Sequence, residues 1–155
     1  MLTLGIETSC DETSSAVLEN GHRILSNIVS SSLAQHQPFG GVVPEIASRH
    51  CLEQIDLVFR LALRKAKVSE KDLDLIAVTQ GPGLVGSLLV GVSAAKGLAY
   101  SLGKPLVAVN HIEGHLYAGI LDHPHLEPPY VALVASGGHT HLYHAESPGI
   151  HRLLG

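Results

Sequence analysis

The stretch that most constrains the fold runs from Pro105 to Tyr117 and reads PLVAVNHIEGHLY. Its apolar, β-branched beginning predicts a buried strand, and Asn110 is a residue type that can cap a following helix. His111 and His115 lie four positions apart, so both imidazoles share one face of that helix and can reach a single ion. Open α/β sheets bind ligands beyond the carboxyl ends of their strands, which is where this pair is expected.

The histidine content of the chain weakens this signal when it is taken alone. The sequence holds 11 histidines in 155 residues, and about one pair at this spacing then arises by chance. Spacing therefore leaves a metal site and an ordinary pair of core histidines equally open.

Short apolar segments near the N-terminus predict three strands, at residues 2–8, 15–19 and 24–30. Asn20 and Gly21 mark a tight turn between the second and the third. Strands joined by short turns pair in antiparallel fashion, so this region is expected to form a meander.

The middle of the chain alternates between helix and strand. Residues 35–43 are expected to be loop, and Pro44 opens an amphipathic helix that continues to Ala66. A strand over residues 73–79 then leads through a glycine turn into the segment 84–102. This order of elements predicts an α/β fold with a mixed sheet flanked by helices.

The segment 84–102 is apolar almost all round and could be mistaken for a membrane span. Lys96 lies inside it and three serines dilute it, so a helix buried in an α/β core explains it better. We therefore expect no membrane association.

The C-terminal part predicts a helix over residues 112–121 and strands at 130–135 and 142–145. Between the two strands, Ser136, Gly137 and Gly138 form a turn in which backbone can approach a bound group, because glycine has no side chain. The chain stops within an apolar run, which suggests a fragment of a longer protein.

Composition narrows the class of protein. The chain has 45% apolar and 15% charged residues and a net charge of -4, as expected for one ordered domain with a core. Its 10 Lys and Arg form no cluster along the sequence. Cys10 and Cys51 have no metal-ligand or disulfide spacing, and the N-terminus has no signal-peptide pattern, which together predict a cytoplasmic protein.

Two polar turns are candidate ligand loops. The turn SCDETS carries Asp11 and Glu12 among hydroxyl groups, so it can serve as a phosphate or metal-water loop, or as an ordinary hairpin whose side chains cap their own backbone. The turn GPGLVGS lacks the ending of a Walker loop, which leaves a packing turn at least as plausible as an anion site.

Five motifs in order give the sequence a family resemblance. They are GIETSCDETS at 5–14, GGVVPEIASR at 40–49, GPGLVGSLLVG at 81–91, NHIEGH at 110–115 and SGGHT at 136–140. Together they resemble the bacterial form of the TsaD (YgjD, Gcp) family of tRNA adenosine threonylcarbamoyltransferases.

The resemblance implies an actin-like or sugar-kinase-like fold (ASKHA, RNase H-like) of two similar domains, with residues 1–155 as the first. It implies that His111 and His115 bind a divalent metal, Fe²⁺ or else Zn²⁺. It also implies substrate contacts at Val134, Ala135, Ser136, Gly137 and Gly138. A further metal ligand, an Asp, is expected in the missing second half, so the fragment alone is expected to be inactive.

The activity implied is transfer of the threonylcarbamoyl group from threonylcarbamoyl-AMP to N6 of the adenosine beside the anticodon, in tRNAs that read ANN codons. Asp11 and Glu12 are then candidate catalytic groups that orient the substrate or accept a proton. The family's partners would be tRNA, a TsaB-like paralogue and a TsaE-like ATPase. An isolated fragment is also expected to form a homodimer through surfaces meant for missing parts.

Two other functions fit some of the same residues. A metalloendopeptidase would use the histidine pair, but zincin motifs place Glu beside a histidine, whereas Glu113 is separated from both by Ile112 and Gly114. A non-catalytic actin-like scaffold would use the helices at 44–66 and 84–102 for association and would not need the pair.

Overall fold

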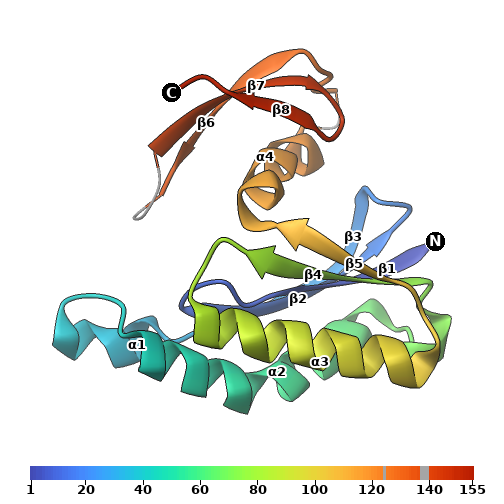
Figure 1. Cartoon of the computed structure of the whole chain (residues 1–155). Helices are drawn as coiled ribbons and strands as arrows, with labels where there is room; N and C mark the ends of the chain where they lie inside the picture. The colour runs from blue at the N-terminus through green and yellow to red at the C-terminus, as the bar shows by residue number, and fades with distance from the viewer. Residues whose placement is uncertain (124, 137–139) are drawn as a thin grey trace. The chain divides into compact units, whose positions relative to one another are not determined.

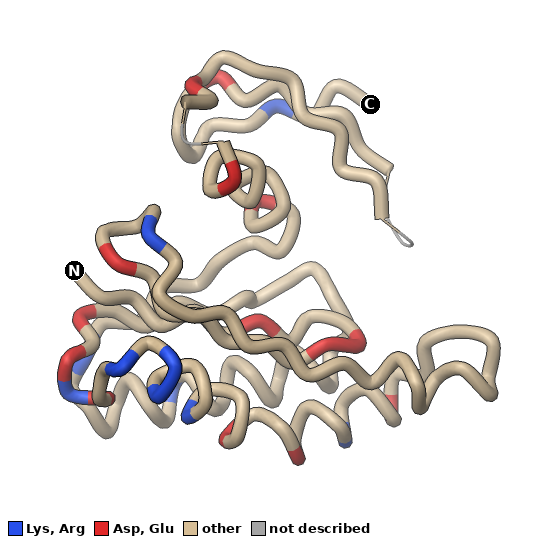
Figure 2. Tube along the Cα trace, turned by 180° about the vertical axis from the view of Figure 1, so that it is seen from behind, with Lys and Arg blue, Asp and Glu red and all other residues tan. Residues whose placement is uncertain are grey.

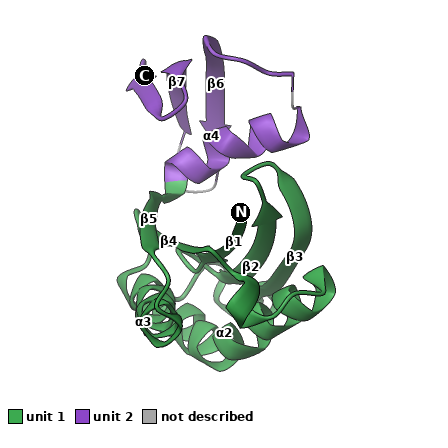
Figure 3. Cartoon of the chain, turned by 90° about the vertical axis from the view of Figure 1, so that its right-hand side faces the viewer, with its two compact units in different colours: residues 1–111 green, residues 112–155 purple. Residues whose placement is uncertain are grey.

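The computed structural model describes residues 1–123, 125–136 and 140–155. It divides the chain into two compact units, Met1–His111 and Ile112–Gly155, which Figure 3 colours separately. The first unit contains β1 (Leu2–Glu7), β2 (Glu12–Glu19), β3 (Arg23–Ser31), α1 (Leu33–His36), the 3-10 turn η1 (Gln37–Phe39), α2 (Pro44–Ala66), the 3-10 turn η2 (Glu70–Asp72), β4 (Leu75–Gly81), α3 (Val85–Leu102) and β5 (Leu106–Asn110). Helix α4 (His111–Asp122) begins at the last residue of this unit and is followed by β6 (Tyr130–Ala135), β7 (Thr140–Ser147) and β8 (Ile150–Leu153).

The first unit is built on a mixed five-stranded sheet in the order β3-β2-β1-β4-β5 (Figure 1). β1 pairs with β2, and β2 with β3, in antiparallel fashion. The turn between β2 and β3 uses left-handed backbone at Asn20 and Gly21, with φ of 54° and 78°, which the two residue types tolerate best. β4 lies parallel to both β1 and β5, because α2 and α3 return the chain to the same end of the sheet. The α/β class and mixed sheet are confirmed.

Both long helices pack on one face of this sheet (Figure 1). α2 contacts β2, β3 and α3, and α3 contacts β4. Alternation along β1 explains the core, since Leu4 and Ile6 are buried under the helices while Gly5 and Glu7 belong to the opposite face. The buried core comprises Leu4, Ile6, Val17, Ile55, Ala62, Leu63, Leu73, Ile76, Val78, Ala95 and Ala99. Within residues 1–111, all of which are described, no helix covers the opposite face of the sheet.

The prediction that α3 is buried in the core holds for one face of the helix only. Its buried residues are small and four apart: Ser87, Gly91, Ala95 and Ala99. Val85, Leu89 and Tyr100 are 81%, 66% and 92% exposed. Small side chains let one face of the helix approach its neighbours closely, and the other face is left uncovered within this unit. Among the described residues, α3 is long and apolar enough to cross a membrane by length and composition alone.

Three other predictions need correction. β5 was expected to be buried, but Val107 is 46% exposed, because β5 is an edge strand and one face of the sheet has no cover in this unit. Residues 35–43 were expected to be loop, but α1 and η1 continue to Phe39 before Gly40 ends the turn in a left-handed conformation. β8 was not predicted, because its four residues are too few to show a periodic pattern.

The second unit combines α4 with a three-stranded antiparallel sheet in the order β6-β7-β8. β6 has the predicted bounds, and β7 extends beyond the predicted 142–145 at both ends. Its buried core is small: Ile112, Leu116 and Val134, with Ala132 and Tyr143 packed against them. That residues 1–155 form the first domain of a larger protein stays a prediction.

Candidate functional site

The carboxyl ends of the parallel strands β1, β4 and β5 meet at one edge of the first sheet. β1 ends at Glu7, β4 ends at Gly81 and β5 ends at Asn110, directly before His111. Adjacent strands lie about 5 Å apart, so residues far apart in sequence come together here. This is the edge at which open α/β sheets bind ligands.

His111 is held at this edge by two residues of the β1 end. Its Nδ1 atom lies 2.9 Å from Ser9 Oγ and 3.3 Å from Glu7 Oε2. Ser9 Oγ lies 3.2 Å from the same carboxylate oxygen, and the Ser9 N–H donates to Glu7 Oε1. Metal-binding histidines commonly have a carboxylate or hydroxyl at the second ring nitrogen, so His111 fits the predicted role of metal ligand through Nε2. Sequence reasoning missed Glu7 and Ser9.

His115 lies one turn further along α4, so the helix predicted for the histidine pair is confirmed. The described part of the chain contains no group of three or more His, Cys, Asp or Glu arranged to hold a metal ion. The ion that the pair would bind stays a prediction.

Asp11 and Glu12 occupy the turn between β1 and β2, where Glu12 is the first residue of β2. The Asp11 carbonyl oxygen accepts hydrogen bonds from Ser32 N at 3.0 Å and Ser32 Oγ at 2.6 Å. In the described part of the chain, neither carboxylate takes part in a hydrogen bond or an ion pair. The turn is therefore anchored through its backbone, and neither acidic side chain is committed to a structural contact.

Behind this turn lies a buried histidine that the sequence did not single out. His36 Nδ1 accepts the Val43 N–H at 3.2 Å, and its Nε2 lies 2.9 Å from Ser32 Oγ. Since Nδ1 accepts, Nε2 carries the proton and donates to Ser32, which in turn donates to Asp11. His36 thus connects residues 32–43, through Ser32, to the turn that carries Asp11 and Glu12. Nothing in the local sequence pattern signals this contact.

The glycine turn after β4 packs closely against Ser9. The Leu84 N–H donates to the Ser9 carbonyl oxygen at 2.6 Å, so this amide is used within the protein and not by an anion. A Cβ atom at Gly83 would overlap with the same Ser9 oxygen, which explains why glycine is needed at this close approach. The turn thereby fixes Ser9 beside His111.

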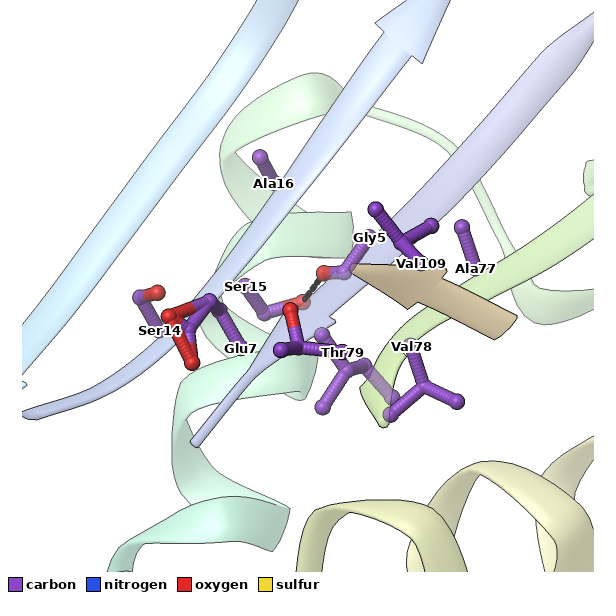
Figure 4. Close-up of a pocket in the computed structure, with 10 residues that line it drawn as sticks. Gly5, Glu7, Ser14, Ser15, Ala16, Ala77, Val78, Thr79 and Val109 are labelled. Carbon is purple, nitrogen blue, oxygen red and sulfur yellow. Dashed lines mark hydrogen bonds between the residues drawn. The ribbon is translucent and has the colours of Figure 1, made fainter. Parts of the chain in front are cut away.

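The uncovered face of the sheet carries a hollow of about 200 Å³ (Figure 4). It forms because small residues stand opposite each other on neighbouring strands, with Gly5 paired to Ala16 and to Ala77. Glu7 and Ser14, which are also paired, lie together at one end of the hollow (Figure 4). The Glu7 carboxylate therefore both borders the hollow and contacts His111.

Cys10 does not add a nucleophile to this turn. Burial raises the pKa of the Cys10 thiol above its ordinary value, and the Ser9 hydrogen bond only partly opposes this effect. A raised pKa keeps the thiol protonated at neutral pH and makes it a poor nucleophile.

The predicted substrate contacts belong to the second unit. The Val134 side chain is buried in its small core, Ala135 is the last residue of β6, and Ser136 follows. Gly137 and Gly138 lie outside the described residues. The binding role of these five residues stays a prediction.

Basic residues gather in the fold although they form no cluster along the sequence. At the end of α2, Arg60, Arg64 and Lys71 line one hollow, and Lys104 Nζ donates to the Lys71 carbonyl oxygen at 3.4 Å. Figure 2 shows Asp and Glu beside these cations, and Arg60 pairs with Asp56 at 2.9 Å. The surface is therefore of mixed charge.

Comparison with known proteins identifies relatives of the whole chain. A family model described as tRNA N6-adenosine threonylcarbamoyltransferase (TsaD) matches residues 23–155. A Clostridioides difficile protein of that name is 56% identical over 155 residues, which is 100% of this chain and 46% of the relative. A Thermosipho melanesiensis protein of the same name is 57% identical over 150 residues, 97% of this chain and 46% of the relative. The chain spans about half the length of the curated relatives it matches.

Solved structures resemble the chain in fold. YeaZ from Pseudomonas aeruginosa matches with a TM-score of 0.66 and 21% identity, over 99% of this chain and 64% of that one. Component A of (R)-2-hydroxyglutaryl-CoA dehydratase from Acidaminococcus fermentans matches with a TM-score of 0.56 and 14% identity, over 99% and 47%. At these identities the likeness shows a shared fold alone.

Proposed function

Because the chain belongs to the tRNA N6-adenosine threonylcarbamoyltransferase (TsaD) family, we propose that it forms the N-terminal part of an enzyme that transfers threonylcarbamoyl to tRNA. The donor would be threonylcarbamoyl-AMP and the acceptor N6 of the adenosine beside the anticodon in tRNAs that read ANN codons. The observation that carries this proposal is the setting of His111. It stands at the carboxyl edge of the sheet with Glu7 and Ser9 at its Nδ1 atom.

In the proposed reaction, the N6 amine attacks the carbamoyl carbon of the mixed anhydride. A C–N bond forms, the bond from that carbon to the phosphate oxygen breaks, and AMP leaves. Asp11 or Glu12 would accept the proton that the amine loses. Both carboxylates lie in the turn that His36 and Ser32 anchor through the Asp11 carbonyl oxygen. Residues 134–138 would bind the adenylate.

A divalent metal ion, Fe²⁺ or Zn²⁺, would be held by His111 and His115 and, when bound, would act as a Lewis acid toward carbamoyl or phosphate oxygens. Imidazole nitrogens suit both ions. The role of this chain's residues is to present the two rings from the first turns of α4.

We also propose the finer features of the fold and its partners. The mixed sheet with its helices, together with the fold likeness to YeaZ, supports an actin-like (ASKHA) domain. That likeness also supports a TsaB-like partner of similar fold. A TsaE-like ATPase, a homodimer of the isolated chain and a cytoplasmic location complete the proposal.

Metal content tests the central claim. We expect the purified chain to retain a divalent metal that is lost in His111→Ala and in His115→Ala, because each removes one ligand. Circular dichroism of the three proteins serves as the folding control. Equal metal in all three would remove the assigned site.

The catalytic role proposed for Asp11 and Glu12 is tested by measuring transfer activity when the second half of a TsaD relative is supplied. We expect Glu12→Ala or Asp11→Ala to lower transfer by about 100-fold, as removal of a general base commonly does. Exposed Glu53 in α2 provides a matched control, and Glu53→Ala should leave transfer unchanged. Full activity in both turn variants would exclude a catalytic role for them.

A scaffold function is the second candidate, and the exposed face of α3 favours it. Val85, Leu89 and Tyr100 form an uncovered apolar surface within the first unit, as expected of a helix that meets a partner. A scaffold has no need of a bound ion, so the metal measurement also separates these two functions.

A further inference from the structure

Glu7, Ser9 and His111 form a compact cluster that brings together the end of β1 and the start of α4. Ser9 is fully buried, and the His111 side chain is 16% exposed. The contacts are 2.9 Å from Ser9 Oγ to His111 Nδ1, 3.3 Å from Glu7 Oε2 to the same nitrogen, and 3.2 Å from Ser9 Oγ to Glu7 Oε2. All three lie within hydrogen-bond or ion-pair range, so each group constrains the other two.

The donors and acceptors in this cluster can be assigned from chemistry. An ionised carboxylate only accepts hydrogen bonds, so Glu7 takes the Ser9 hydroxyl proton at Oε2 and the Ser9 N–H at Oε1. Since the Ser9 proton is already donated, Ser9 Oγ must accept from the His111 ring. The contacts of Nδ1 with Ser9 Oγ and Glu7 Oε2 are thus both with acceptors. A neutral His111 therefore carries its proton on Nδ1 and its lone pair on Nε2.

We propose that Glu7 and Ser9 are positioning residues that hold neutral His111 in the Nδ1–H tautomer with Nε2 as the ligand atom. This rests on the proposed function only for the identity of the ligand, a divalent metal. Hydrogen bonding of the second ring nitrogen to a carboxylate fixes tautomer and orientation and raises the basicity of the ligating nitrogen. Neither residue touches substrate in this assignment.

The surrounding structure keeps Ser9 in place for this task. Its carbonyl oxygen accepts the Leu84 N–H at 2.6 Å, and the lack of a side chain at Gly83 allows that approach. Ser9 is consequently fixed from the α3 side through its backbone and presents its hydroxyl to Glu7 and His111. The turn Gly81–Pro82–Gly83 (the GPG turn) thus has an indirect part in orienting the proposed metal ligand.

The first measurement needs no metal. Long-range ¹H–¹⁵N NMR of the ¹⁵N-histidine-labelled chain, with His111→Ala to assign the signal, reports which ring nitrogen carries the proton. We expect Nδ1–H in the unsubstituted chain. Ser9→Ala removes the hydroxyl and Glu7→Gln replaces a pure acceptor by an amide that can also donate, so both should shift His111 toward the Nε2–H form. Glu19→Gln, at the opposite end of the sheet, is the matched control.

The second measurement is calorimetric titration of the same proteins with Zn²⁺. We expect Glu7→Gln and Ser9→Ala to weaken binding by about tenfold or more, while Glu19→Gln leaves it unchanged. Thermal melts show whether each variant is folded. Because two different residues are substituted, the test still holds if one variant does not fold.

The outcomes separate the positioning role of Glu7 and Ser9 from the metal site of the proposed function. An Nε2–H tautomer in the unsubstituted chain, or an unchanged tautomer and Zn²⁺ affinity in both variants, would overturn the positioning role. A tautomer that shifts as expected in a chain that binds no Zn²⁺ would sustain the positioning role and count against the metal site of the proposed function.

Discussion

The two units of the chain differ in how much core supports them. The first unit, Met1–His111, buries a continuous core drawn mainly from three strands, β1, β2 and β4, and two long helices. The second, Ile112–Gly155, has four buried apolar side chains among its described residues, Ile112, Leu116, Val134 and Ala145, and a three-stranded sheet. Small sheets need packing against further structure to be stable in isolation. We therefore expect the first unit to be the more stable part of this chain and the second to be the weaker part.

The difference also matters for the proposed chemistry. Glu7, Ser9, Asp11 and His111 all belong to the first unit, where neighbouring strands and the GPG turn hold them. His115 and residues 134–136 belong to the second. The residues of the first unit are thus supported by a large core, and those of the second by a small one.

The largest expected effect comes from the core itself. Leu4 and Ile76 are fully buried, so Leu4→Ala or Ile76→Ala should lower the free energy of unfolding of the first unit by about 3 kcal/mol. Leu116→Ala should cost about 2 kcal/mol and affect only the second unit. Hydrogen exchange resolved by residue measures both, with Leu52→Ala, which changes an exposed residue, as the control. Equal loss of protection in β1 on Leu116→Ala would show that the units unfold as one.

A smaller effect distinguishes two helix glycines. A Cβ atom at Gly91 in α3 would overlap with Thr8 Oγ1, which donates to the Ser87 carbonyl oxygen at 2.8 Å. Gly91→Ala should therefore destabilise the first unit by about 1–3 kcal/mol. At Gly119 in α4 nothing lies within 4 Å of an added Cβ.

Gly119→Ala should instead stabilise the second unit by about 0.5–1 kcal/mol, since alanine is the better helix former. Denaturant melts give both values, and Gly97→Ala, also in open space on α3, is the control. A stabilising Gly91→Ala would mean that the first unit is less tightly packed than the contacts indicate.

The smallest effect concerns acid sensitivity of the first unit. Hydrogen bonds from the Ser69 hydroxyl and backbone lower the pKa of Asp72 below its ordinary value. A carboxyl with a lowered folded-state pKa contributes stability above the unfolded-state pKa, and this contribution is lost as pH falls through the folded-state pKa. Ser69→Ala should raise the Asp72 pKa in an NMR titration and reduce that acid-dependent part of stability. An unchanged Asp72 pKa would contradict the capping role of Ser69.

Local elements were largely predictable from the sequence. The helix expected from Pro44 to Ala66 and the strand expected at 130–135 have those bounds in the structure. Both are long or strongly patterned, and a pattern reports which face of an element is apolar. The same reasoning failed for α3, since an apolar pattern does not say whether a second surface is present to cover it.

The candidate site was only half predictable. The pairing of His111 with His115 follows from helical spacing, and α4 has that spacing. Glu7 and Ser9 were missed because Ser9 and His111 are 102 positions apart, and no local pattern reports such a contact. His36 was missed for a similar reason, as its role appears only through Ser32, Asp11 and Val43.

The sequence by itself determined the elements, the family and the two histidines of one helix, because these depend on neighbouring residues and on motifs in order. The tertiary structure alone decided that Glu7 and Ser9 meet His111. Parallel pairing of β1, β4 and β5 brings strand ends from distant parts of the chain to one edge. That strand order is set by burial of a shared core, so contacts at the edge follow from the whole fold and not from any one segment.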